Sequence, residues 1–115
     1  MFRPAFLAIL LALPAAAQDL ARVAERQAFL DAVAGRDLSR LGITVQVQPD
    51  GRITGSAFGA PVTGSWDWQD GFFCREMSWG PREWAQNCQA VYLGGGTVRF
   101  VADRGRGDTA DLSLD

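Results

Sequence analysis

The pattern of hydrophobic and polar residues changes its period once along the chain. Between residues 19 and 34, apolar side chains recur at helical spacing, with Leu20 and Leu30 near one face. Asp19 is suited to cap a helix and Gly35 is suited to end one, so we predict an amphipathic helix over residues 19–34. An apolar stripe of this moderate width more often faces the protein core than a partner protein.

From Ile43 onward, apolar and polar residues alternate, which is the period of a half-buried β-strand. Turns that contain Gly, Pro or Asp divide this alternation into short segments. The predicted strands cover residues 43–48, 52–58, 62–69, 72–79, 84–93, 97–103 and 109–114. Residues 37–42 are expected to form a turn, with a single helical turn as an alternative, and residues 104–108 are expected to form a loop.

The middle strands carry apolar side chains on both faces, and this limits the architecture. Trp66, Trp68 and Phe73 share one face, whereas Phe72 and Tyr92 lie on the other. The sheet must therefore be covered on both sides. Because every connection is short, we predict an α+β fold: one N-terminal helix packed on a curved antiparallel meander of six or seven strands. A small closed β-barrel is the alternative.

The dipeptide Asp70-Gly71 is the clearest hairpin signal in the sequence. Folding the chain about this turn predicts three cross-strand pairs: Trp68 with Phe73, Trp66 with Arg75, and Val62 with Trp79. The second pair would let the guanidinium of Arg75 stack on the indole of Trp66.

The two cysteines are predicted to form a disulfide. If the next hairpin is centred on Pro81, Cys74 and Cys88 lie opposite each other, with Cα atoms about 4.5 Å apart. The bond would close a loop of about 15 residues and stabilise the fold by roughly 3 kcal/mol in the chain-entropy model. An even number of cysteines in an exported chain favours this bond over two free thiols.

The N-terminus has the pattern of a secretory signal peptide, which we assign to residues 1–17. Arg3 supplies the positive charge, an apolar run follows it, and Ala15-Ala-Ala17 offers a small-residue cleavage site. The apolar run is too short to span a bilayer, so we expect no transmembrane segment after cleavage. Residues 18–115 would then form a single domain that is periplasmic or secreted.

The composition narrows the possible chemistry. The chain has 115 residues, a net charge of −2, and neither His nor Lys. The charge provides no basic surface for nucleic acid. The missing His excludes Ser-His-Asp and Cys-His sites, and the missing Lys excludes Schiff-base chemistry and a P-loop. We therefore lean away from an enzyme, and we expect no cofactor and no metal.

Acidic residues do not change this expectation. On the predicted register, the possible acid-base pairs among Asp67, Asp70, Glu76 and Glu83 do not converge. Residues 103–108 faintly resemble a calcium loop, but the two arginines within it and the few side-chain oxygens argue against that reading.

The best candidates for function are aromatic and arginine side chains on the hairpins: Trp79, Trp84, Arg82, Arg75 and Trp66. The regular alternation of Trp66 with Trp68 favours the core for both, whereas Trp79 and Trp84 flank the Gly80-Pro81 turn and are expected to be more exposed. We predict a non-catalytic periplasmic domain that binds a protein or small ligand through this surface. The alternative is an inhibitor that inserts residues 80–84 into the cleft of an envelope or secreted hydrolase.

Several motifs resemble a group of small exported alphaproteobacterial proteins of undefined function. The motifs are Gly59-x-Pro61, Gly64-Ser-Trp-x-Trp-x-Asp-Gly-x-Phe-Cys-Arg75, Asn87-Cys-Gln89, Val98-Arg-Phe100 and Gly105-x-Gly-Asp108. Proteins of this group often carry the name dihydrodipicolinate reductase. The residues here do not support that activity, because the reductase has a dinucleotide-binding Gly-rich turn and a His/Lys motif in a much longer, two-domain chain. The resemblance covers most of the mature chain.

Overall fold

The structure is a computed structural model that describes residues 20–115. The predicted signal peptide, residues 1–17, lies outside the described residues. In chain order the elements are β1 (Ala21–Val23), α2 (Arg26–Val33), β2 (Leu38–Arg40), β3 (Ile43–Val47), β4 (Arg52–Ala57), β5 (Ala60–Gln69), β6 (Phe72–Trp79), β7 (Arg82–Gly94), β8 (Thr97–Val101), α3 (Ala102–Gly105) and β9 (Thr109–Leu114).

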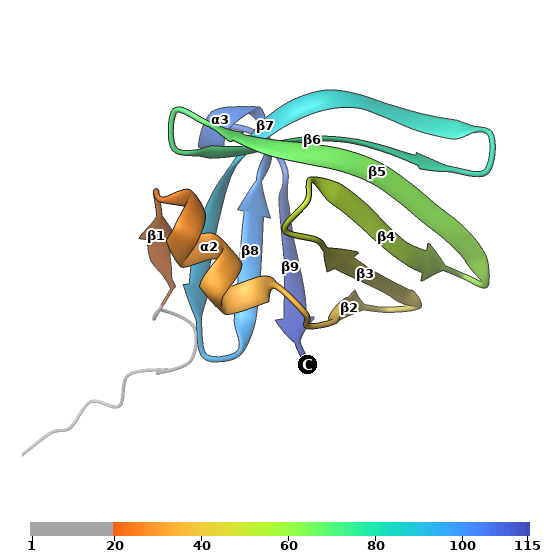
Figure 1. The fold of residues 1–115 in the computed structure, drawn as a ribbon, viewed down its shortest axis with the longest axis horizontal. Coiled ribbons are helices and arrows are strands. Elements are labelled where there is room, and N and C mark those ends of the chain that lie inside the picture. The colour runs from red at the N-terminus through yellow and green to blue at the C-terminus, as the bar shows by residue number, and fades with distance from the viewer. Residues whose placement is uncertain (1–19) are drawn as a thin grey trace, which may run out of the picture.

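The strands from β2 to β9 close into an antiparallel barrel (Figure 1). Each of these strands pairs with the next, and β9 pairs back with β2 through Leu38 opposite Leu114 and Ser39 opposite Ser113. β1 lies outside the ring and pairs with β7. The antiparallel strands of the sequence prediction are confirmed. The open curved sheet that we favoured is wrong, and the closed barrel that we held as the alternative is the observed form.

Two glycines inside strands favour this closure. A Cβ atom on Gly55 would collide with the backbone oxygen of Thr44, and one on Gly64 would collide with that of Glu76. Neighbouring strands therefore approach each other at these positions more closely than a side chain permits. Such close approach allows the sharp coiling that a barrel of few strands requires.

Three segment predictions are wrong, and two of them fail for the same physical reason. Residues 21–23 form β1 instead of helix because β7 continues beyond the end of β6, which leaves an edge that β1 fills. Residues 38–40 form β2 instead of a turn because β3 and β9 supply ladder partners on both sides. Tertiary pairing overrides weak local propensity in both cases. The strand predicted to reach residue 103 ends at residue 101, where α3 follows.

The register of the central hairpins is confirmed. Across β5 and β6, Val62 pairs with Trp79, Trp66 with Arg75, and Trp68 with Phe73. Cys74 pairs with Cys88 and is bonded to it by a disulfide with a Cα–Cα distance of 3.8 Å, somewhat shorter than the expected spacing. Between this pair and the turn, a β-bulge shifts the register by one residue, so Met77 lies opposite Trp84.

The two ends of the barrel differ because successive turns of a meander alternate between them. The β3–β4, β5–β6 and β7–β8 turns lie at one end, and α2 covers this end (Figure 1). We call it the closed end. The β2–β3, β4–β5 and β6–β7 connections lie at the other, which we call the open end; the β4–β5 and β6–β7 hairpins there point away from α2. The β8–β9 connection, which contains α3, lies beside the β5–β6 hairpin, where the Arg104 guanidinium carbon is 5.1 Å from the centroid of the Phe72 ring.

At the closed end, α2 inserts Phe29 into the barrel. Phe29 is 0% exposed, and its ring centroid lies 5.1 Å from those of Trp68 and Phe73 and 5.7 Å from that of Trp66. Leu30 and Val33 from the same helix join this core. The helix therefore faces the core, as its apolar stripe predicts.

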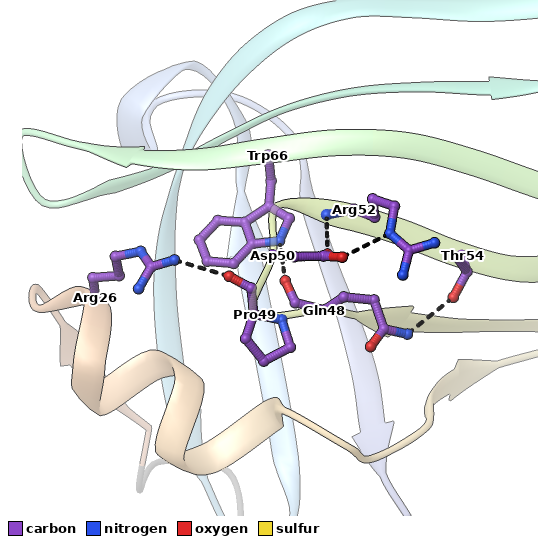
Figure 2. Close-up of polar contacts among 7 residues, drawn as sticks. All are labelled: Arg26, Gln48, Pro49, Asp50, Arg52, Thr54 and Trp66. Carbon is purple, nitrogen blue, oxygen red and sulfur yellow. Dashed lines mark hydrogen bonds and ion pairs between the residues drawn. The ribbon is translucent and has the colours of Figure 1, made fainter.

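Polar contacts fasten the β3–β4 turn to the closed end (Figure 2). The Trp66 Nε1–H donates to the Gln48 carbonyl at 2.9 Å, and the Arg26 guanidinium donates to the Pro49 carbonyl at 3.1 Å. The Arg26 guanidinium carbon also lies 5.1 Å from the centroid of the Trp66 ring. The cation that stacks on Trp66 is thus Arg26, and not the Arg75 expected from the hairpin register.

Candidate functional site: a cavity at the open end

A cavity of about 620 Å³ occupies the open end of the barrel. Buried apolar side chains form its floor, namely Val47, Ile53, Phe73, Phe100 and Leu112. Exposed residues form its rim, namely Arg40, Leu41, Phe58, Asp108 and Thr109. A lining that runs from buried to exposed residues describes a cleft that opens to solvent, and its volume lies in the range of small-molecule sites.

Strand alternation supplies most of this lining. Residues Ile43, Val45 and Val47 on β3 all line the cavity because alternate residues of a strand point to the same side. The alternation that predicts a half-buried strand thus also places an apolar wall in the barrel. The helix α2 does not fill the space between the walls at this end, since none of its residues lines the cavity.

The β-bulge in the β6–β7 hairpin places Trp84 in the lining. On the shifted register Trp84 lies opposite the inward-facing Met77, and both residues line the cavity. On the register of the cysteine pair, Trp84 would lie opposite Ser78, whose neighbour Thr63 faces outward. One extra residue in β7 therefore places Trp84 on the same strand face as Met77, which packs against the core, and re-aiming a side chain in this way is a known use of bulges.

Besides the exposed polar residues of the rim, two polar side chains interrupt the apolar lining, Arg75 and Gln89. They are diagonal neighbours, since Arg75 lies opposite Asn87 and Gln89 lies two residues further along β7. Gln89 is only 8% exposed, and no hydrogen bond joins its side chain to another residue of the described chain. Burial lowers the pKa of the Arg75 guanidinium from its ordinary value. The guanidinium remains charged at neutral pH, because an arginine pKa begins so far above it.

The rim exposes two large apolar side chains. Leu41 in the β2–β3 turn is 88% exposed and Phe58 in the β4–β5 turn is 69% exposed. Phe58 has a φ of 51°, a left-handed conformation that is uncommon for a bulky residue. Its ring centroid lies 5.9 Å from that of Trp79, whose Nε1–H donates to the Ala57 carbonyl at 2.9 Å. Trp79 thus supports the rim from the neighbouring hairpin.

A polar clamp holds the connection between β8 and β9, whose flanking residues border the cavity. The Asn87 amide donates to the Asp103 carboxylate at 2.8 Å, and the Asp103 backbone N–H donates to the Asn87 side-chain oxygen at 3.0 Å. Asp103 and Arg104 both have a positive φ. The clamp holds this strained turn, and Ala102 and Asp108 on either side of it line the cavity.

Four of the five binding residues proposed from the sequence lie together at the open end. Arg75 and Trp84 line the cavity, and the guanidinium carbon of Arg82 lies 5.0 Å from the Trp84 ring centroid. Trp79 packs on the rim. Trp66 is different, because it is 6% exposed and its indole N–H is bonded within the closed end. The binding roles of all five stay predictions.

Sequence reasoning missed Gln89, Leu41 and Phe58. A signal for Gln89 was present, since it shares a strand face with the apolar Val91 and Leu93, and a polar residue on such a face is unusual. Phe58 precedes Gly59 at a tight turn where Asn or Asp is expected, so the aromatic residue departs from ordinary turn chemistry.

The outer face of the hairpins carries a second, more polar groove of about 430 Å³ that includes Glu76 and Glu83. Within residues 20–115, no group of three or more His, Cys, Asp or Glu side chains is placed to hold a metal ion. None of the helices in that range is long and apolar enough to cross a membrane.

Comparison of the chain with family models, curated proteins and solved structures finds no match. The functional argument therefore depends on the geometry and chemistry of the cavity.

Proposed function

We propose that this domain is a non-catalytic binding module that holds a small, largely apolar ligand in the cavity at the open end, and that it acts in the periplasm or outside the cell. The tryptophan- and arginine-rich hairpin forms one wall of the cavity mouth. The observation that carries the proposal is an apolar cavity of about 620 Å³ that opens to solvent within an otherwise packed barrel.

The size and lining of the cavity support ligand binding over a packing defect. Protein interiors pack densely and rarely contain voids larger than a water molecule. An eight-stranded barrel is just wide enough for its side chains to fill it or for one small ligand to occupy it. Here α2 fills the closed end, so the space at the open end is available to a ligand.

The proposed compartment is supported by chemistry at two positions in the chain. Cys74 and Cys88 form a disulfide, a bond that persists in oxidising compartments and is rare in the cytosol. The predicted signal peptide over residues 1–17 is the sequence observation that agrees with it.

Binding can be tested with Nile red, a neutral dye that fluoresces in apolar surroundings. We expect the purified domain to enhance its fluorescence with one saturable site, and Ala110→Trp to abolish the enhancement, because Ala110 lines the cavity. The matched control is Ser113→Trp, which adds the same ring to an exposed position of the same strand and should leave dye binding unchanged.

Two outcomes would count against the proposal. One is the absence of saturable dye binding by the folded wild-type domain. The other is equal binding by the two tryptophan variants, which would place the dye outside the barrel.

A second candidate function is inhibition of an envelope or secreted hydrolase by the β6–β7 hairpin. The observation that favours it is the exposed tip of this hairpin, Gly80 to Glu83, which points away from the closed end (Figure 1). The test is to assay lysozymes and secreted proteases with and without the domain. Inhibition that Arg82→Ala weakens and Ala110→Trp preserves would favour this function, and no inhibition of any enzyme would remove it.

A further inference from the structure

Within the proposed binding function, the polar groups of the cavity specify the chemical class of the ligand. The apolar lining alone would accept any small hydrophobic molecule. Gln89, which is buried, and Arg75, which is half-buried, do not fit that description, because both line the cavity beside buried apolar side chains. Placing such groups in a cavity is unfavourable unless they find hydrogen-bond partners.

Within residues 20–115, the protein provides only one hydrogen-bond partner for these two side chains. The only hydrogen bond of the Arg75 guanidinium to another described residue is one to the Ala85 carbonyl at 3.2 Å. No described carboxylate lies within ion-pair distance of it, since the two ion pairs found there involve Arg52 and Arg99. The Gln89 amide has no bonded partner among the same residues. Donors from both side chains are therefore free to bind a ligand.

The charges around the cavity favour an acid over a base. Three charged residues line it, of which Arg40 and Arg75 are positive and Asp108 is negative. Asp108 and Arg40 are exposed at the rim, where water screens them, whereas Arg75 is half-buried. The charge that acts in the low-dielectric part of the cavity is thus positive.

We infer that the cavity binds an aliphatic monocarboxylic acid, with the carboxylate at Arg75 and Gln89 and the hydrocarbon chain against the floor of the cavity. A carboxylate accepts two parallel hydrogen bonds from a guanidinium and a further one from an amide N–H. The chain would contact Val47, Ile53 and Phe100, which are buried at the floor. This inference rests on the proposed function, since it requires that the cavity be a ligand site.

The experiment compares three probes with the same alkyl chain: decanoate, decanol and decyltrimethylammonium. Each probe is titrated against Nile red bound to the wild-type domain at pH 7, with decanoate and the cation below their critical micelle concentrations and decanol below its solubility limit. We expect decanoate to compete at a concentration about tenfold lower than decanol, as one charge-assisted hydrogen bond predicts. We expect the cation to compete more weakly than decanol.

Variants then assign the preference to the two side chains. Arg75→Met removes the charge and keeps an unbranched side chain, so the advantage of decanoate over decanol should disappear. Gln89→Leu should reduce that advantage severalfold. The control Arg52→Gln removes a positive charge at the closed end, outside the cavity lining, and should keep the wild-type preference.

The outcomes separate this inference from the proposed function. If decanol and decanoate compete equally in the wild-type domain, or if Arg75→Met and Gln89→Leu both keep the preference, the carboxylate site is wrong although the cavity binds. If no probe competes and Nile red itself does not bind, the proposed function is wrong as well. The wild-type comparison needs no variant to fold, and circular dichroism establishes the fold of those that are used.

Discussion

The two ends of the barrel contain turns of the same geometry but use them differently. At the closed end, the β5–β6 turn has Asp70 at a φ of 53° and Gly71 at 85°. At the open end, the β4–β5 turn has Phe58 at 51° and Gly59 at 85°. Asp is a favoured residue for this left-handed position, whereas a bulky aromatic residue is not.

The two ends also differ in the hydrogen bonding of their polar side chains and in the exposure of their apolar ones. At the closed end, the indole N–H of Trp66 donates to Gln48 and that of Trp68 donates to the Ala24 carbonyl at 3.0 Å. At the open end, the buried Gln89 amide has no partner within the described chain, and Leu41 and Phe58 are exposed. The closed end meets the ordinary requirements of folding, whereas the open end departs from them. Departures of this kind are expected where a molecule binds.

The largest effect should come from emptying the closed end. We expect Phe29→Ala to lower the free energy of unfolding by roughly 3–5 kcal/mol, because it leaves a cavity among four aromatic rings. The matched change at the open end is Leu41→Ala, which should cost less than about 0.5 kcal/mol because Leu41 is exposed. Urea unfolding measures the loss of stability in both variants. Similar losses would contradict the proposed difference between the two ends.

The disulfide should have the next largest effect, because it fastens the hairpin that leads to the open end. Reduction, or the double change Cys74→Ala with Cys88→Ala, should lower the free energy of unfolding by roughly 3 kcal/mol. Denaturant unfolding with and without a reducing agent measures this loss. The double variant is the control, since the reducing agent should not affect it further. A wild-type midpoint that does not move on reduction would contradict the prediction.

Exchanging the residues of the two matched turns tests the comparison directly. Phe58→Asn places a favoured residue before Gly59 and should raise the free energy of unfolding by up to about 1 kcal/mol, even though a contact with Trp79 is lost. Asp70→Phe places a disfavoured residue in the equivalent turn and should lower it by about 1 kcal/mol. Thermal unfolding of both variants shows whether the signs are opposite. A loss of stability in both would mean that Phe58 is selected for folding.

The smallest effect should come from the ion pair between Arg99 and Asp111 on the barrel wall, away from both ends. A hydrogen bond from Arg99 at 2.7 Å lowers the pKa of Asp111 below its ordinary value of 3.8. The stabilisation of the fold by this hydrogen bond is thus fully present above pH 3.8 and is lost as the pH falls through the lowered pKa of Asp111. Because the pair is exposed, Asp111→Asn should cost less than about 0.5 kcal/mol at pH 7. The cost should shrink as the pH falls below 3.8, and a difference that does not diminish would exclude the ion pair as its cause.

Local patterns predicted the parts of the fold that depend on neighbouring residues. The Asp70-Gly71 turn and the alternation beside it determine the β5–β6 register, so the pairing of Trp66 with Arg75 followed from counting residues. The cysteine pair followed in the same way. The β-bulge could not be predicted from this counting, and it decides that Trp84 faces the cavity. Gln89 was visible as a polar residue on an apolar strand face, but its significance depends on the absence of a partner.

The sequence by itself determined the antiparallel hairpins, the bridge between Cys74 and Cys88, and an apolar helix face. It also excluded catalysis that needs His or Lys. Only the tertiary structure decided that β9 returns to β2, that α2 closes one end, and that the other end keeps an apolar cavity with an arginine in it. The physical reason is the sequence separation between the residues that interact. Turn conformation and strand period are set within a few residues, whereas ring closure and the space inside it depend on segments more than 70 residues apart, as Leu38 and Leu114 are.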